Sequence, residues 1–404
     1  MADNLIDNPG FDNPAASVDG QTYNRIVIKI GTSTLTDDSG RIDHGFIQNL
    51  ADQVHRVKSE LGSQILIVTS GAIASGLEAL GFASRPTDVP SLQAAAAVGQ
   101  LRLSQNYAEA FAVYGLKLGQ VLLTRFDTEN RNSYLHARDT LERLLELDAV
   151  PLINENDTVA VDEIRFGDND NLAAQVAILV KADLVVILSD IAGLYSADPR
   201  IYEDAVLLRS IGSFTKEITE AAGAAGTTRG SGGMVTKLEA ARICMAAGIP
   251  MVICEGRQPD AVLQVARGES LGTRFAADLA RSPGARRLWQ ALAGQVLGSV
   301  YIDSGAERAL RERGSSLLPV GIKRVEGSFE AGAAVDIRNL DGMVIGRGLA
   351  NYNSLTLAET AGKSTGQLAA ATGSRGASSA AAAEGAMPSA AQVAIHRDQL
   401  VIFF

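Results

Sequence analysis

A lysine stands inside an apolar run near the start of the chain, where a cation needs a partner. Lys29 lies near the end of RIVIKI (25–30) and is followed by Gly31. A buried lysine is costly unless an anion meets it. Gly31 lets the backbone approach a ligand closely and offers N–H groups to an anion. A surface lysine at a strand end is the alternative, but the small residues after Lys29 favour a phosphate site.

A second group of small residues follows the next apolar run. Ser70, Gly71 and Ala72 come between QILIVT (64–69) and a segment of small residues that predicts a helix. At a helix N-terminus, backbone N–H groups and the Ser70 hydroxyl would face an anion. Ordinary punctuation between a strand and a helix has the same composition, so both interpretations stay open.

The densest polar segment spans 153–171, INENDTVAVDEIRFGDNDN, between two apolar elements. A solvated loop would explain the composition. However, Asn and Asp residues come directly after a buried strand and again before LAAQVAILV, where they could bind an ammonium group or orient a metal-bound nucleotide. The function-bearing interpretation is therefore preferred for these side chains: Asn154, Glu155, Asn156, Asp157, Asp162, Glu163, Asp168, Asn169, Asp170 and Asn171.

Two further segments have the composition of nucleotide-binding loops. Ser189 and Asp190 end the last long apolar run, at the start of LSDIAGLYSADP, where nucleotide contacts are expected. GSGGMVTK (230–237) is rich in glycine, opens a predicted helix and places Lys237 in its first turns. Its spacing does not fit a Walker loop, and a flexible linker would look similar apart from the helix that follows.

Composition restricts the class of protein. The 404 residues are 46% apolar and 20% charged, enough for two domains with separate cores. The net charge of −10 argues against a general nucleic-acid binder. Two cysteines and four histidines without metal-ligand spacing indicate neither a disulfide framework nor a zinc site. No signal peptide or membrane-length apolar run is recognisable, so a soluble cytoplasmic protein is expected.

Apolar runs and amphipathic segments alternate over most of the chain. Such alternation predicts an α/β fold, an open and mainly parallel sheet with helices on both faces and ligands beyond the carboxyl ends of the strands. One helix should begin after Asp43 and end at Gly62. The strands are expected at 25–30, 64–69, 116–123, 150–154, 184–188 and 250–254.

The alternation fades near 272–283, and short runs broken by Gly, Ser or Asp then predict a small β-rich domain. The domains are accordingly predicted as a disordered tail over 1–24, a catalytic domain over 25–279, a linker over 280–287 and a β-rich domain over 288–404. That last domain would contain a low-complexity Ala, Gly and Ser insertion at about 364–391.

Several segments, in this order, resemble the glutamate 5-kinases of the amino-acid kinase family: IKIGTSTLT, IVTSGAIASG, INENDTVAVDEIRFGDNDNLAAQVA, LSDIAGLYSADPR and GSGGMVTKLEAA. The resemblance covers nearly all of residues 25–275. ERGSSLLPVGI and the terminal HRDQLV look like the PUA domain found in these enzymes. The resemblance implies an amino-acid kinase fold followed by a small, β-rich PUA domain.

The resemblance also implies roles for individual residues. Lys29, Asp170 and Lys237 would be catalytic, with Asp170 organising the two lysines and orienting Mg²⁺ bound to ATP. Ser70, Asp157 and Asn169 would bind glutamate. The ATP contacts would be Lys29, Ser189, Asp190, Ser231, Gly232, Gly233, Met234, Val235, Thr236 and Lys237. Ser231 stands where the family usually carries Thr, a change that keeps the hydroxyl.

The activity implied is ATP-dependent phosphorylation of the glutamate side-chain carboxylate, giving glutamyl 5-phosphate in the first step of proline biosynthesis. A carboxylate with an ordinary pKa of about 4.3 is already ionised at neutral pH and needs no general base. Proline as a feedback inhibitor, glutamyl phosphate reductase as a pathway partner and a homo-oligomer, dimer or tetramer, are also implied.

Two alternatives stay open. Aspartate, acetylglutamate and uridylate kinases share the fold, although a PUA-like tail is not expected in them. The PUA-like region could instead make this an RNA-binding or RNA-modifying protein, since PUA domains elsewhere bind RNA. The neutral charge of the C-terminal part and its few aromatic residues argue against RNA binding.

Overall fold

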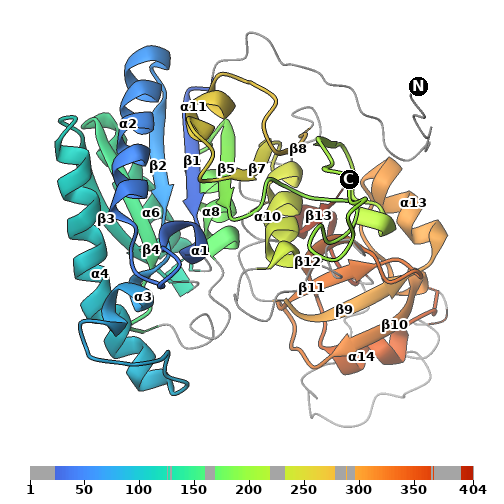
Figure 1. The fold of residues 1–404 in the computed structure, drawn as a ribbon. Coiled ribbons are helices and arrows are strands. Elements are labelled where there is room, and N and C mark those ends of the chain that lie inside the picture. The colour runs from blue at the N-terminus through green and yellow to red at the C-terminus, as the bar shows by residue number, and fades with distance from the viewer. Residues whose placement is uncertain are drawn as a thin grey trace, which may run out of the picture. The chain divides into compact units, whose positions relative to one another are not determined.

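The computed structural model describes residues 23–124, 126–127, 130–159, 169–218, 233–277, 288, 296–364, 367 and 393–403. The chain divides into two compact units (Figure 1). The larger unit takes most of the described residues up to 277, and the smaller one takes those from 288 onward together with the described residues of 125–134 and 246–248. Among the described residues, no helix is long and apolar enough to cross a membrane.

The first predicted strand and helix begin and end where their residue types place them. Strand β1 is Arg25–Ile30, and helix α2 is His44–Leu61. The Asp43 carboxylate caps α2 by accepting a hydrogen bond from the backbone N–H of Phe46 at 3.0 Å. Gly62 ends the helix with a φ of 70°, a left-handed conformation that glycine adopts without a steric penalty.

The other strands of the larger unit are β2 (Gln64–Val68), β3 (Lys117–Leu123), β4 (Ala149–Glu155), β5 (Leu184–Ser189), β6 (Ser210–Ile211), β7 (Met251–Glu255) and β8 (Thr273–Phe275). Its other described helices are α1 (Thr32–Leu35), α3 (Ala72–Leu77), α4 (Val89–Ala112), α6 (Arg131–Glu146), α8 (Asn169–Leu179), α10 (Met234–Ala246) and α11 (Ala261–Ala266). Each predicted strand lies within one residue of an observed strand at both ends.

These strands form one sheet in the order β3-β4-β2-β1-β5-β7-β8-β6. All neighbouring pairs are parallel except β7 with β8, so the prediction of a mainly parallel sheet is confirmed. Figure 1 shows β1 between β2 and β5 in the middle of the sheet. Parallel strands bring their carboxyl ends to one edge, so the segments after β1, β2, β4 and β5 lie close together.

The two faces of β1 have different neighbours. Ile26, Ile28 and Ile30 are fully buried in a core that α2, α4 and α11 also contribute to. Because successive side chains of a strand point to opposite faces, Val27 and Lys29 face the other side, where α8 packs against β1. The two free cysteines, Cys244 on α10 and Cys254 on β7, are both buried.

Helices α3 and α4 pack closely through two glycines. A Cβ atom added to Gly76 would lie 1.9 Å from the carbonyl oxygen of Ala95, and one added to Gly99 would lie 1.8 Å from the carbonyl oxygen of Ala72. No side chain fits in these places, so α3 and α4 are joined backbone to backbone.

The sequence predicts the fold to begin at Arg25, but Tyr23 already belongs to the core. Its side chain is 2% exposed, its carbonyl accepts a hydrogen bond from the Ser63 hydroxyl and its own hydroxyl accepts one from Arg274. The alternation was also expected to fade from residue 272, where the structure instead has the short strand β8, between β7 and β6. Three residues are too few for a periodic signal.

The smaller unit is built on a second sheet, in the order β10-β9-β11-β12-β13. Its strands are β9 (Val296–Ile302), β10 (Ile322–Gly327), β11 (Ala334–Arg338), β12 (Val344–Leu349) and β13 (Leu400–Ile402). Helices α13 (Ser304–Arg313) and α14 (Ser354–Thr360) and the short 3-10 helices Pro319–Gly321 and Arg397–Gln399 complete it. The β-rich prediction is confirmed, and most of the predicted 364–391 insertion lies outside the described residues.

Candidate active site

Three predicted catalytic residues meet at one buried point. The Lys29 ammonium lies 2.5 Å from Asp170 Oδ1, and the Lys237 ammonium lies 3.4 Å from Asp170 Oδ2. The three residues are only 4%, 0% and 8% exposed for Lys29, Asp170 and Lys237. They come from β1, α8 and α10, so the fold brings together residues that are far apart in the chain.

The two lysines keep the Asp170 carboxylate ionised. Burial alone would raise the pKa of Asp170, because it disfavours the charged form. The ammonium groups of Lys29 and Lys237, with hydrogen bonds from Lys29 and Thr236, outweigh burial and lower the pKa to about 2. Two cations and one anion leave this buried cluster with a net positive charge, which suits a phosphate ligand.

The elements around the cluster explain how it is held. Lys29 pairs with Val68 of β2 and Ile187 of β5, near the carboxyl end of the sheet. On α10, the Thr236 hydroxyl lies 2.9 Å from both Asp170 Oδ2 and the carbonyl oxygen of Gly233, so the start of that helix is tied to α8.

A separate network of uncharged amides lies beside the cluster, at the ends of β2 and β4. Asn169 Nδ2 donates to the carbonyl oxygen of Thr69 at 2.6 Å, to Asn154 Oδ1 at 2.8 Å and to Ser70 Oγ at 3.1 Å. The structure thus places two predicted substrate-binding residues, Ser70 and Asn169, in contact with each other. Ser70 lies shortly after the end of β2, and Asn169 begins α8, directly before Asp170 of the Lys29 cluster.

The network continues away from the site into α4. Asn154 Nδ2 donates to Gln100 Oε1 at 2.7 Å, and Gln100 Nε2 donates to Ser104 Oγ at 3.1 Å. Gln100 is 8% exposed and was not among the predicted site residues. The signal available in the sequence was one amide in the otherwise small and apolar stretch AAAAVGQL, on a helix whose other buried positions are mostly apolar.

A buried tyrosine supports the Thr69 end of this region. The Thr69 and Tyr107 hydroxyls lie 3.0 Å apart, and Tyr107 is fully buried on α4. Burial raises the pKa of Tyr107, so its hydroxyl stays protonated. Tyr107 therefore fixes the strand end that carries Ser70.

The other predicted site residues are spread over neighbouring segments. Ser189 ends β5 and is buried, and its hydroxyl donates to the exposed Asp190 carboxylate at 3.2 Å. Asp157 lies half-buried in the turn after β4. Gly233 directly precedes α10, and Met234, Val235 and Thr236 form its first turn with Lys237. Ser231 and Gly232 lie outside the described residues.

Asp170 is the one carboxylate of the buried cluster that could take part in holding a metal ion. Among the described residues, no group of three or more His, Cys, Asp or Glu side chains is arranged to hold a metal. Asp170 offers one carboxylate, and both of its oxygens already face cations. Mg²⁺ commonly keeps several waters and is held by one or two carboxylates plus substrate phosphates. Asp170 could supply the protein's share of such a site.

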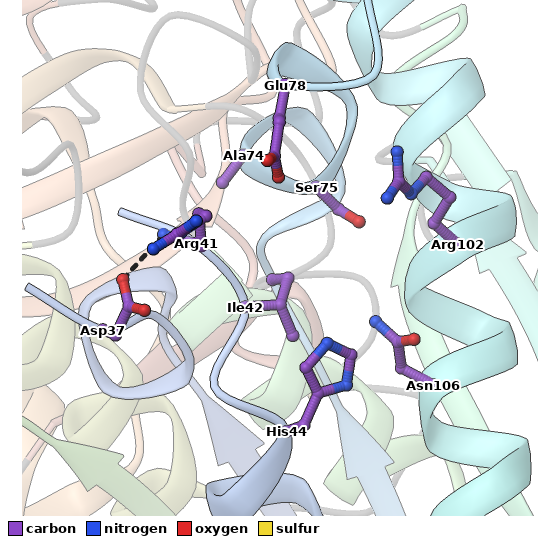
Figure 2. A pocket seen from close by; sticks show the side chains of 9 residues that line it. All are labelled: Asp37, Arg41, Ile42, His44, Ala74, Ser75, Glu78, Arg102 and Asn106. Atoms are coloured by element: carbon purple, nitrogen blue, oxygen red, sulfur yellow. Dashed lines mark hydrogen bonds between the residues drawn. The ribbon is translucent and has the colours of Figure 1, made fainter. Parts of the chain in front are cut away.

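A cavity of about 350 Å³ lies elsewhere in the larger unit, between the 37–44 loop, α3 and α4 (Figure 2). Glu78, directly after α3, and Arg102 of α4 contribute charged groups to its lining. No predicted site residue of the described chain lines this cavity. It is therefore distinct from the Lys29 cluster.

Comparisons with known proteins identify two domains in this chain. The model of the amino acid kinase family matches residues 24–255, and the PUA domain model matches residues 298–370. Among solved structures, the UMP kinase of Bacillus anthracis aligns with a TM-score of 0.44 and 14% identity, covering 64% of this chain and 98% of that one. That likeness is too distant to add to the assignment.

Curated relatives are much closer. The chain is 45% identical to the glutamate 5-kinase of Geobacter sp. (strain M21), covering 85% of this chain and 92% of that protein. It is 48% identical to the enzyme of the same name from Methylobacillus flagellatus, over 82% of this chain and 89% of that protein. For the Pelobacter propionicus enzyme the identity is 42%, over 94% and 97%. The chain therefore belongs to the amino acid kinase family and, within it, to the glutamate 5-kinases that carry a C-terminal PUA domain.

Proposed function

We propose that this chain transfers the γ-phosphoryl group of ATP to the side-chain carboxylate of L-glutamate, giving L-glutamyl 5-phosphate. The observation that carries the proposal is the convergence of Lys29 and Lys237 on the buried Asp170 carboxylate. An anionic carboxylate must approach an anionic phosphoryl group, and the main task of the protein is to offset that repulsion.

Lys29 and Lys237 supply the positive charge for this step. Their ammonium groups stabilise the equatorial and bridging oxygens of the phosphoryl group as negative charge develops there. Asp170 holds both lysines in fixed positions, so they need not reorganise during the reaction. A preorganised cation in a site shielded from water stabilises charge more strongly than the same cation in bulk solvent.

No protein group has to remove a proton. The attacking glutamate carboxylate is ionised at neutral pH, so the oxygen that attacks phosphorus is already a nucleophile. The phosphorus–oxygen bond to ADP breaks as the bond to the carboxylate oxygen forms, and ADP leaves as an anion. Lys29 and Lys237 thereby contribute electrostatic stabilisation without acid–base chemistry.

Substrate and nucleotide are assigned to opposite sides of the cluster. Ser70, Asn169 and Asp157 would hold glutamate at the ends of β2 and β4. Ser189, Asp190 and the segment from Ser231 to Lys237 would hold ATP beyond β5 and at the start of α10. When bound, Mg²⁺ supplies charge neutralisation on the phosphates, and Asp170 is the acidic residue placed to orient it.

The chemistry of the product suggests the next enzyme of the pathway. An acyl phosphate is reactive in water, so we propose that this chain passes glutamyl 5-phosphate to a glutamyl phosphate reductase in proline biosynthesis. Proline, as the pathway product, is the proposed feedback inhibitor, competing at the glutamate site. A cytoplasmic homo-oligomer, dimer or tetramer, is proposed on the same family grounds.

A coupled ADP-release assay tests the proposal. L-glutamate, L-aspartate, N-acetyl-L-glutamate and UMP are offered as acceptors, each with and without proline. We expect turnover with L-glutamate, inhibition by proline, and a hydroxamate when hydroxylamine traps the acyl phosphate. Faster turnover with any other acceptor would contradict the assignment.

A further inference from the structure

Gln100 lies behind the candidate substrate site and has no role in the function proposed above. It sits on the buried face of α4, and its side chain is joined to the substrate side through Asn154 and Asn169. Gln100 and Asn169 are far apart in the sequence, so the sequence alone does not reveal this connection. The inference below rests on the proposed function, because it concerns how glutamate is bound.

Backbone groups fix the direction of the chain of amides. The carbonyl of Thr69 can only accept, so it takes a hydrogen from Asn169 Nδ2 at 2.6 Å. The backbone N–H of Glu155 can only donate, and it donates to Asn154 Oδ1 at 2.9 Å. Turning the amide of Asn169 would place two oxygens against each other at the Thr69 contact. Turning that of Asn154 would place two donors against each other at the Glu155 contact.

With Asn154 so oriented, its Nδ2 group needs an acceptor inside the protein. Gln100 Oε1 is that acceptor, at 2.7 Å, and among the described residues it is the one that Asn154 Nδ2 reaches. Asn154 is 2% exposed, so water does not readily replace Gln100. A buried donor that loses its partner costs more than the bond itself contributed, and the side chain would turn or shift to avoid the loss.

The orientation of Asn169 decides what the substrate meets. Its two Nδ2 hydrogens are directed to Thr69, Asn154 and Ser70, so its Oδ1 atom points away from them. Among the described residues, Oδ1 accepts no hydrogen bond, although the side chain is only 6% exposed. A carbonyl oxygen held in this way is an acceptor for an ammonium group, the one cationic group of glutamate.

We propose that Gln100 is a positioning residue for glutamate binding, which holds Asn154 and thereby directs the Asn169 Oδ1 atom at the substrate's α-ammonium group. Gln100 does not touch substrate. Its effect is on affinity for the amino group and not on phosphoryl transfer, because the Lys29 cluster does not depend on it.

Steady-state kinetics of the full-length chain separate these effects. Gln100→Met keeps the length of the side chain and removes the acceptor, and we expect it to raise KM for L-glutamate at least about tenfold, the effect of one hydrogen bond to a charged group. KM for ATP and kcat should stay within about twofold. Gln105→Met is the matched control, because Gln105 is exposed on the same helix and its one side-chain hydrogen bond within the described part of the chain is to Glu109 of that helix.

A conservative variant tests the acceptor directly. Gln100→Glu keeps an oxygen facing Asn154, and the Ser104 hydroxyl can turn to donate to the second oxygen. It should keep KM for glutamate within about threefold of the unmodified chain. If Gln100→Glu raises KM as much as Gln100→Met, the acceptor role is wrong.

Glutarate, which is glutamate without its amino group, distinguishes positioning from general damage. Used as a competitive inhibitor, glutarate should show nearly the same Ki with the unmodified chain and with Gln100→Met. A Ki that rises as much as KM for glutamate would overturn the proposal. Glutamate-dependent turnover by the unmodified chain tests the proposed function separately, and it persists even if Gln100 proves to have no role.

Discussion

Each of the two units buries a carboxylate between two cationic side chains, but the two clusters are built differently. In the smaller unit, Arg347 Nε lies 2.9 Å from Asp336 Oδ1, and Arg338 lies 3.5 Å from Asp336 Oδ2. Asp336 and Arg347 face each other across neighbouring strands of one hairpin. In the larger unit, Asp170 collects its lysines from β1 and α10, which are distant in sequence.

The difference extends to what the cations can still bind. Arg338 also donates to Ser299 Oγ and to the carbonyl oxygen of Gly342, so each of its three nitrogens has a partner within the smaller unit. Lys29 has three donor hydrogens, and among the described residues its ammonium has one polar partner, Asp170. A local cluster whose cations are bonded within their own sheet stabilises a fold, whereas a cluster assembled from distant elements, in which Lys29 keeps donor hydrogens, can bind an anion.

The largest expected effect is on turnover by the Lys29 cluster. Lys29→Ala should lower kcat by about a thousandfold, because it removes a preorganised cation from the phosphoryl group. The coupled ADP-release assay measures the loss, and circular dichroism checks that the fold is retained. Near-normal turnover by Lys29→Ala would mean that the Lys29 cluster, like the Asp336 cluster, only stabilises the fold.

The matched change in the smaller unit should affect stability instead. Arg347→Met leaves Asp336 buried without its closest partner, and we expect a loss of about 3 kcal/mol in the free energy of unfolding of that unit. Chemical denaturation measures this change, and kcat should stay within about twofold. A large loss of kcat in a folded variant would mean that the smaller unit takes part in the reaction.

The pKa of Asp170 gives a smaller and pH-dependent effect. In the fold its pKa is lowered from 3.8 to about 2, so its contribution to stability is complete above about pH 4 and is lost as the pH falls towards 2. The contribution should be on the order of 2 kcal/mol. Comparing urea unfolding of the unmodified chain with Asp170→Asn over this range measures it. A difference that does not shrink on acidification would contradict the assignment.

The smallest expected effect is on the pH dependence of kcat, which should be nearly flat around neutral pH. If the lysines act only by their charge and the carboxylate nucleophile is already ionised, kcat should change less than about twofold between pH 6 and 8. A bell-shaped profile with a pKa near 6.5 would point to a histidine acting as a base, which the proposed mechanism does not contain.

Local features of the sequence were enough to predict much of the larger unit. The β1 strand and the caps of α2 depend on residues within a few positions of each other, so their bounds were predicted correctly. The short strand β8 and the burial of Tyr23 depend on partners outside their own segments, Met251 and Arg274 among them, and carry no periodic signal. Tertiary pairing decides such short elements.

Some residues of the candidate site could likewise be predicted from the sequence, and others could not. Lys29, Asp170 and Lys237 stood out because charged residues beside glycines and strand ends are unusual, and the family resemblance gave them roles. Gln100 could not be assigned from the sequence, because a single amide on a helix of small residues is compatible with a surface position. Only the contact with Asn154 reveals what it does.

The two buried cysteines have a practical consequence. Burial raises the pKa of Cys244, and burial together with the neighbouring Glu255 raises that of Cys254 to about 12. Neither thiol forms an appreciable thiolate at neutral pH, and the thiolate is the species that alkylating reagents attack. A cysteine engineered on the surface could therefore carry a fluorophore or spin label while both natural thiols remain in place.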